Sequence, residues 1–297
     1  MKQYLPFLLL PLFACDPGQN IDSDSPEAND EFEVVAHIAS EPDGLHPTNN
    51  NTLNMAYIFE SIHKKVYRTD MESYELNPEL AASAPELIDS TTYRITLKDA
   101  KWDDGTPLTS EDVRFTLLLN MHPLTSNNQK KGVFRELVDS IRVIDERTFD
   151  YVTNYPFAGA NYVWSDMVVI SRNFYDKEGA FNNTTFKEIR MESDTSDAKK
   201  SWFENFNSRK YSHNPEYING IGGYKVTDWQ TNSIITVERK DNWWGASVDS
   251  KYFSTNPKTI HYKIITDEEP TDVAINNQKI DVAFALSSAQ AHDFEKD

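Results

Sequence analysis

Cysteine is almost absent from this chain of 297 residues, which contains only Cys15. One thiol cannot form an internal disulfide, so covalent cross-links within the chain are excluded. Basic residues are also scarce, because 29 Lys and Arg face 47 Asp and Glu and give a formal net charge of -18. Nucleic-acid binding depends on Lys and Arg that neutralise phosphates. We therefore expect no nucleic-acid partner.

Long apolar runs and catalytic signatures are missing as well. The longest apolar run, from Leu5 to Phe13, is too short to span a bilayer and is typical of a signal-peptide core. The sequence has no G-x-S-x-G, no P-loop and no G-x-G-x-x-G. Its seven His show no zinc-ligand spacing. We expect no enzymatic activity, no cofactor and no metal. The alternative, a membrane-anchored hydrolase, needs a nucleophile, base and orienting group that the spacing does not supply.

The first residues predict export and anchoring. Leu12-Phe13-Ala14-Cys15 resembles a bacterial lipobox, which implies cleavage before Cys15 and attachment of lipid to its thiol. Residues 1–14 would then be a lipoprotein signal peptide. Residues 15–31 are acidic and poor in apolar side chains, which predicts a flexible tether. The alternative is an ordinary secretory peptide with a chance Cys.

From residue 32 the pattern predicts a packed mixed α/β or α+β fold, and 39% hydrophobic residues are sufficient for its core. Alternation predicts strands over 32–39, 93–98, 234–239 and 260–265, and a hairpin with its turn at 145–147. The Pro and Gly of 40–47 predict a loop. Apolar residues at helical spacing predict a helix ending near Tyr67-Arg68, through Met55, Ile58, Phe59, Ile62 and Val66.

The acidic stretch KWDDGTPLTSEDV, residues 101–113, has three possible interpretations. An EF-hand beginning at Asp99 fails, because Asp104 stands where Gly is required and Ser110 where Glu closes the loop. A catalytic pair needs two carboxylates that face one pocket. A turn at Asp103-Asp104-Gly105, followed by a Thr109–Asp112 capping box, explains these acids without a site. We interpret the stretch as the boundary between a strand and a helix.

The same stretch resembles a signature of extracellular solute-binding proteins of family 5, the peptide- and nickel-binding proteins of ABC importers. The matching positions are Trp102, Asp104, Gly105, Pro107, Leu108, Thr109, Glu111, Asp112 and Val113. Further segments follow in the order of that family. These are SEPDGLHP (40–47), YIFESIHKKVYRTD (57–70), LNPELAAS (76–83), GIGGYKV (220–226), VERKDNWWG (237–245) and the run from Ile260 through IDVAF (280–284).

The resemblance implies a fold like that of type II periplasmic binding proteins, with two hinged lobes. Residues 32–297 would form the family domain. Residues 32–50 and 206–270 would build the first-lobe sheet, 51–205 an inserted subdomain, and 271–297 the start of a second lobe. Family members are usually nearly twice this long. We therefore expect a truncated reading frame or a partial sequence with the second lobe largely missing. The alternative is a natural short protein with its own fold.

The function that the resemblance implies is capture of oligopeptides or dipeptides outside the cytoplasmic membrane and delivery to an ABC permease. The protein would be a lipid-anchored monomer on the periplasmic or cell-surface face of a bacterial membrane. Ligands of open α/β sheets lie at the C-terminal ends of strands. We therefore expect ligand contacts from Ser40, Glu41 and His46, on the loop that leaves the first strand. We also expect an apolar wall from Trp229, because it follows the Gly-rich turn at 220–226. The alternatives are a carbohydrate-binding surface lipoprotein and a nickel-binding member of the same family.

Overall fold

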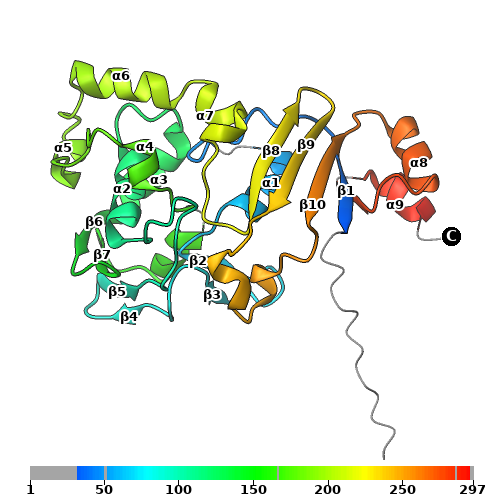
Figure 1. Ribbon diagram of the computed structural model, residues 1–297. Coiled ribbons are helices and arrows are strands. Elements are labelled where there is room, and N and C mark those ends of the chain that lie inside the picture. The colour runs from blue at the N-terminus through cyan, green and yellow to red at the C-terminus, as the bar shows by residue number, and fades with distance from the viewer. Residues whose placement is uncertain (1–31, 50–51, 166, 285, 295–297) are drawn as a thin grey trace, which may run out of the picture.

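The computed structural model describes residues 32–49, 52–165, 167–284 and 286–294. The predicted signal peptide, Cys15 and the acidic tether lie outside these residues. Two larger sheets stand on either side of the chain's central helices, so the predicted mixed α/β class is confirmed (Figure 1). No helix in the described part of the chain combines the length and the apolar character that crossing a membrane requires.

The first sheet contains the strand that opens the folded part. Its spatial order is β11 (Val282–Ala283), β1 (Glu33–Ile38), β10 (Thr259–Ile264), β9 (Ile234–Arg239) and β8 (Tyr224–Gln230). β1 is parallel to both neighbours, whereas β8, β9 and β10 are antiparallel to one another. The strands predicted near 32–39, 234–239 and 260–265 are confirmed. The second half of β1 is buried, because sheet partners flank both of its edges and helix α1 packs on its face.

The second sheet comes entirely from the middle of the chain. Its order is β4 (Glu86–Leu87), β5 (Thr92–Thr96), β7 (Thr148–Thr153) and β6 (Val138–Val143), all antiparallel. The strand predicted at 93–98 and the hairpin around 145–147 are confirmed. A separate ribbon pairs β2 (Tyr67–Thr69) with β3 (Leu76–Pro78). The proposed bounds of lobes and inserted subdomain stay a prediction.

Helices cover the sheets and join them. They are α1 (Leu53–Ile62), α2 (Ser110–Met121), α3 (Asn128–Leu137), α4 (Arg172–Tyr175), α5 (Phe186–Arg190), α6 (Asp197–Phe206), α7 (Lys210–His213), α8 (Glu268–Asn276) and α9 (Ser288–Phe294). Short 3-10 helices are η1 (Ala160–Ser165), η2 (Pro215–Tyr217), η3 (Trp244–Ser247) and η4 (Lys251–Phe253). α8 and α9 lie beyond β1, on the opposite side of the molecule from the four-stranded sheet (Figure 1).

Helix α2 lies between two hydrophobic cores. Its Leu117 and Leu118 pack into the core beneath the four-stranded sheet, whereas Phe115 and Leu119 pack into the core of the five-stranded sheet. Because α2 packs against a core on two sides, its apolar residues are not confined to one stripe. α2 therefore fixes the two sheets relative to each other.

The predicted end of the first helix is wrong. α1 ends at Ile62, and Tyr67–Thr69 forms strand β2 instead of a last helical turn. His63 has extended backbone angles, and the carbonyl of Val66 accepts hydrogen bonds from the amides of Glu79 and Ala81. Val66 continues the apolar spacing of α1 because its side chain enters the core. Its backbone is not helical, because pairing with Glu79 and Ala81, which are distant in sequence, overrides the local pattern.

A glycine turn receives the end of α1. The amide of Gly222 donates to the carbonyl of Ile62 over 2.8 Å. A Cβ atom added at Gly220 would lie 2.0 Å from that carbonyl oxygen, and one at Gly222 would lie 2.5 Å from the carbonyl oxygen of Ser61. Only glycine permits such an approach of two backbones. The GIGG turn before β8 therefore docks the first helix onto the first sheet.

The acidic stretch is structural, as interpreted. Asp112 accepts hydrogen bonds from the amide and hydroxyl of Thr109 at 2.8 and 3.0 Å, and from the amide of Arg172 at 2.7 Å. The indole of Trp102 lies 3.4 Å from the same carboxylate. Asp104 accepts from Thr106 within its own turn. The predicted capping box is confirmed, and Asp112 additionally joins α2 to the start of α4.

Asp112→Ala should lower the free energy of unfolding by about 2–4 kcal/mol, because it removes a helix cap and leaves buried donors without an acceptor. Urea unfolding followed by circular dichroism measures this. Glu111→Ala is the matched control, since its carboxylate is 42% exposed and pairs only with arginines at the surface. Its cost should stay under about 1 kcal/mol. Equal costs for the two variants would contradict the structural role of Asp112.

Candidate functional site

A surface hollow lies where the parallel strands β1 and β10 end. Its volume is about 570 Å³. The loop after β1, the β8–β9 turn, the end of β10 and helix α7 contribute its walls, through Ser40, Glu41, Pro42, Asp43, Thr231, Asn232, Ile264, Thr266, Arg209 and His213. We call it the strand-end hollow. Its place agrees with the expectation that ligands of open α/β sheets lie at the C-terminal ends of strands.

Glu41 joins two walls of the strand-end hollow. One carboxylate oxygen accepts from the indole N–H of Trp229 over 2.6 Å, and the other accepts from the amide of Asn232 over 3.1 Å. Asn232 has a φ of 54°, the left-handed conformation that Asn tolerates in a tight turn. Glu41 therefore holds the loop after β1 against the β8–β9 hairpin.

Ser40 and Trp229 each have a further contact that fixes them next to Glu41. The Ser40 hydroxyl accepts from the side-chain amide of Asn54 in α1 over 2.7 Å, and Ser40 itself is exposed. The half-buried ring of Trp229 packs on the imidazole of His213, with ring centroids 4.9 Å apart. The structure thus brings three of the four predicted contact residues together: Ser40, Glu41 and Trp229.

His46 lies deeper than the other three. It is buried, its Nε2 lies 2.8 Å from the carbonyl oxygen of Phe206, and its Nδ1 lies 3.3 Å from the amide of Thr48. Burial lowers the pKa of His46 to about 4, so the ring is neutral at neutral pH. His46 lines an adjoining hollow of about 430 Å³ that we call the middle hollow, together with Asp43, Gly44, Asn49, Thr52, Met55, Ser126, Asn207, Arg209, Ser212 and His213.

Sequence reasoning missed the charges of this site. Asp43 and Arg209 line both hollows, and both are exposed. Neither forms an ion pair with any residue in the described ranges. His213 lies between the hollows, and burial together with the Arg209 charge lowers its pKa. No local pattern marks Arg209 or His213, because only the fold carries α7 to the loop after β1. The amide of Leu45, which donates to the carbonyl of Ser212 over 2.7 Å, makes that contact.

The arrangement suits binding better than catalysis. The Ser212 hydroxyl lies 2.7 Å from Nδ1 of His213, but these residues are neighbours in the chain. No residue that the structure describes forms a hydrogen bond with Nε2 of His213, so the third member of a nucleophile–base–orienter set is not provided there. The described part of the chain also contains no cluster of three or more His, Cys, Asp or Glu able to hold a metal ion.

A family profile matches most of the chain. Residues 75–297, more than half of the chain, match the profile described as bacterial extracellular solute-binding proteins, family 5 Middle.

Comparison with individual proteins agrees. A relative from Agrobacterium fabrum, named probable peptide-binding protein YejA, is 24% identical over 80% of this chain and 34% of its own length. Among solved structures, the ABC transporter substrate-binding protein CtaP from Listeria monocytogenes superposes with a TM-score of 0.66 and 18% identity, covering 90% of this chain and 47% of CtaP. The oligopeptide-binding protein AppA from Bacillus subtilis, solved with a nonapeptide, gives a TM-score of 0.64 and 16% identity over 84% of this chain and 44% of AppA.

In each comparison, the match covers a much larger part of this chain than of the other protein. The chain spans about a third of the length of the curated relatives that it matches and about half of the solved chains. At 16–18% identity, the likeness to CtaP and AppA shows the fold.

Glu41→Ala should free the β8–β9 turn. Losing a charge-assisted acceptor at a partly exposed site should cost about 1–2 kcal/mol of local stability. Amide hydrogen exchange at Asn232 should then be roughly 5- to 30-fold faster. Asp43→Ala is the matched control, because Asp43 is an exposed acid on the same loop without a hydrogen-bond partner in the described chain. Unchanged exchange in Glu41→Ala would show that the loop and the hairpin are held by other contacts.

Proposed function

Because the chain belongs to the bacterial extracellular solute-binding proteins of family 5, we propose that it captures peptides outside the cytoplasmic membrane and delivers them to an ABC permease. The observation that carries the proposal is the strand-end hollow, where Arg209 and Asp43 border the ends of β1 and β10. Neither has an ion-pair partner among the residues that the structure describes. The names of YejA and AppA, which refer to peptides, agree with it.

The charges suit a zwitterionic chain. A free peptide carries a carboxylate at one end and an ammonium at the other. Arg209 matches the carboxylate, for which its planar guanidinium is suited, and Asp43 matches the ammonium. Ser40 is exposed, and no described residue accepts its hydroxyl proton, which can therefore donate to a peptide carbonyl. Glu41 lines the hollow beside Ser40 and accepts a hydrogen bond from Trp229, whereas His46 lies buried further along the same loop. An extended peptide can further pair its backbone with protein strands.

Capture needs no chemical step. In the proposed cycle, a second lobe that begins near residue 271 closes over the peptide by a hinge and covers the strand-end hollow. The first-lobe sheet, with its inserted subdomain at 51–205, serves as the fixed half. Closure removes water from the charged ends of the ligand, which strengthens their hydrogen bonds. The complex then docks on the permease as a monomer.

The proposed location follows from the first residues. Lipid attached to Cys15 would hold the protein at the outer side of a bacterial membrane, in the periplasm or at the cell surface. Residues 16–31 would give it enough reach to meet the permease.

Arg209→Ala should weaken peptide binding. Each lost hydrogen bond to a charged group costs about 1.5–3 kcal/mol, so the Kd of a free-acid peptide should rise by roughly 10- to 150-fold. Isothermal titration calorimetry on the protein expressed from its whole reading frame measures this. The same peptide with an amidated C-terminus lacks the carboxylate. It should bind wild type and Arg209→Ala alike.

Arg147→Ala is the control, because Arg147 is an exposed arginine in the turn before β7, away from the hollow. Equal losses in both variants, or an equal loss for the amidated peptide, would contradict the role given to Arg209. A wild-type protein that binds no peptide would overturn the proposed function.

Cys15 should carry lipid in the mature protein. Intact-mass spectrometry of protein extracted from its native membrane should find a chain beginning at Cys15 with added acyl chains. Cys15→Ser should abolish the added mass and release the protein from membranes. An N-terminus at another residue, or an unmodified Cys15, would contradict the anchor.

A further inference from the structure

A second hollow, rich in aromatic side chains, lies on the side of the five-stranded sheet away from α8 and α9 (Figure 1). Its volume is about 750 Å³, and α4, α6, α7 and η2 form its walls. It shares no lining residue with the strand-end hollow, although α7 contributes to both. We call it the aromatic hollow. The rings that line it are Phe174, Tyr175, Trp202, Tyr211 and Tyr217.

The rings of the aromatic hollow are held firmly but remain accessible. Tyr175 is buried, and the other four are half-buried. The ring centroid of Tyr211 lies 5.7 Å from that of Tyr175 and 5.7 Å from that of Tyr217. Trp202 stacks on the core residue Phe206, with centroids 4.7 Å apart. A ligand that packs on these rings would therefore lose little free energy in ordering them.

The polar tips of these rings are unused. No described residue forms a hydrogen bond with the indole N–H of Trp202 or with the hydroxyls of Tyr211 and Tyr217, and none of these atoms is buried. Ser201 and Asn205 on α6 line the same hollow, and both are exposed. Their side chains also have no hydrogen-bond partner in the described ranges. The aromatic hollow thus presents donors and acceptors beside ring surface.

The charges of the aromatic hollow cancel. Its basic and acidic side chains are equal in number, namely Lys177, Lys210, Glu178 and Glu216. The ammonium of Lys210 lies 3.9 Å from the ring centre of Tyr217, and that of Lys177 lies 5.5 Å from the ring centre of Phe174. Two cations of the chain therefore already occupy places where rings attract positive charge. This disfavours a cationic ligand, and the equal charges favour one without net charge.

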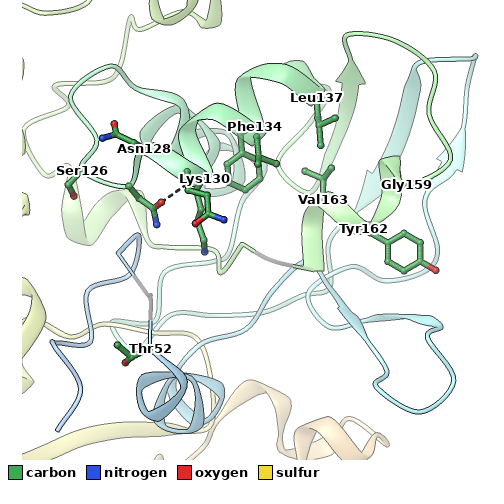
Figure 2. Close-up of a pocket in the computed structure, with 12 residues that line it drawn as sticks. Thr52, Ser126, Asn128, Lys130, Phe134, Leu137, Gly159, Tyr162 and Val163 are labelled. Atoms are coloured by element: carbon green, nitrogen blue, oxygen red, sulfur yellow. Dashed lines mark hydrogen bonds between the residues drawn. The ribbon is translucent and has the colours of Figure 1, made fainter. Parts of the chain in front are cut away.

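The hollow of about 780 Å³ between α3 and η1 gives a contrast (Figure 2). The rings among its described lining residues are Phe134 and Tyr162. Phe134 is 2% exposed, and the hydroxyl of Tyr162 already donates to the carbonyl of Tyr74 over 3.1 Å. Accessible rings with unpartnered polar tips are thus a property of the aromatic hollow and do not come with every depression of this surface.

We propose that the aromatic hollow binds a short oligosaccharide without net charge. A sugar ring has a face of C–H groups, which packs on the electron-rich face of an aromatic ring. Its rim carries hydroxyls, each of which donates and accepts hydrogen bonds. The volume of the hollow lies within the range of small-molecule sites. The site is separate from the strand-end hollow, so the inference does not depend on peptide capture.

The test titrates four neutral sugars into the protein expressed from its whole reading frame: maltotetraose, cellotetraose, mannotetraose and chitotetraose. Calorimetry should find at least one of them bound with a Kd below about 1 mM. Proton NMR of that sugar should show upfield shifts of its C–H signals, because protons above an aromatic face are shielded. Tetramethylammonium chloride probes the rival cation site. It should not bind, because Lys177 and Lys210 repel it.

Variants on the exposed face of α6 locate the site without disturbing the core. Asn205→Ala removes one neutral hydrogen bond and should raise the Kd of the sugar about 2- to 10-fold. Ala198→Trp places a large ring in the hollow from an exposed position and should raise the Kd at least about tenfold. Glu204→Ala is the matched control, because Glu204 is exposed beside Asn205 but does not line the hollow. It should keep the wild-type Kd.

The outcomes distinguish this site from the peptide site. Binding of none of the four sugars, or of tetramethylammonium in their place, would overturn the proposal and leave peptide capture standing. A sugar Kd that Ala198→Trp leaves unchanged, or that Asn205→Ala and Glu204→Ala raise equally, would also overturn it. Peptide binding should be the same in all three variants and in the wild type.

Discussion

The hydrogen bond between the amide of Gly222 and the carbonyl of Ile62 is the contact on which the candidate site depends. It fastens the C-terminal end of α1 to the glycine turn that leads into β8. The loop after β1 is then fixed at both ends, by the sheet before it and by α1 after it. Ser40 and Glu41 lie on that loop. Their positions therefore depend on the close approach of the Ile62 backbone to the glycine turn, which a residue with a Cβ atom would prevent.

Buried and exposed charges have separate roles in this acidic protein. Glu79 is fully buried and accepts from the amide of Lys65 at 2.8 Å and the guanidinium of Arg68 at 3.0 Å, so its charge is satisfied within the fold. Asp112 is satisfied in the same way by Thr109 and Arg172. Asp43 and Arg209 keep their charge at the surface, where a ligand can meet it. Glu79 and Asp112 are thus structural carboxylates, and Glu41 also has internal donors at the hollow, whereas Asp43 and Arg209 lack an ion-pair partner in the described chain.

Local features could be predicted from the sequence, and features that depend on distant contacts could not. The Thr109–Asp112 cap and the hairpin around 145–147 follow from residues within a few positions of each other. The end of α1 was mispredicted because Val66 gives its carbonyl to Glu79 and Ala81, which the periodicity of 55–66 cannot show. Ser40 and Glu41 were predicted as contacts by analogy with strand ends, and Trp229 by its position after the Gly-rich turn. Arg209 was missed because only the tertiary fold carries α7 to that place.

The bond between Trp229 and Glu41 also gives the molecule an internal optical signal. Indole emission changes in wavelength and yield when its N–H partner or the polarity around the ring changes. Trp229 is half-buried, and its N–H donates to the carboxylate of Glu41, which lines the strand-end hollow. A solute that settles there would disturb this indole first, whereas Trp102 and Trp164 stay enclosed in the core. Occupancy would therefore be readable from the unlabelled protein, in solution and in real time.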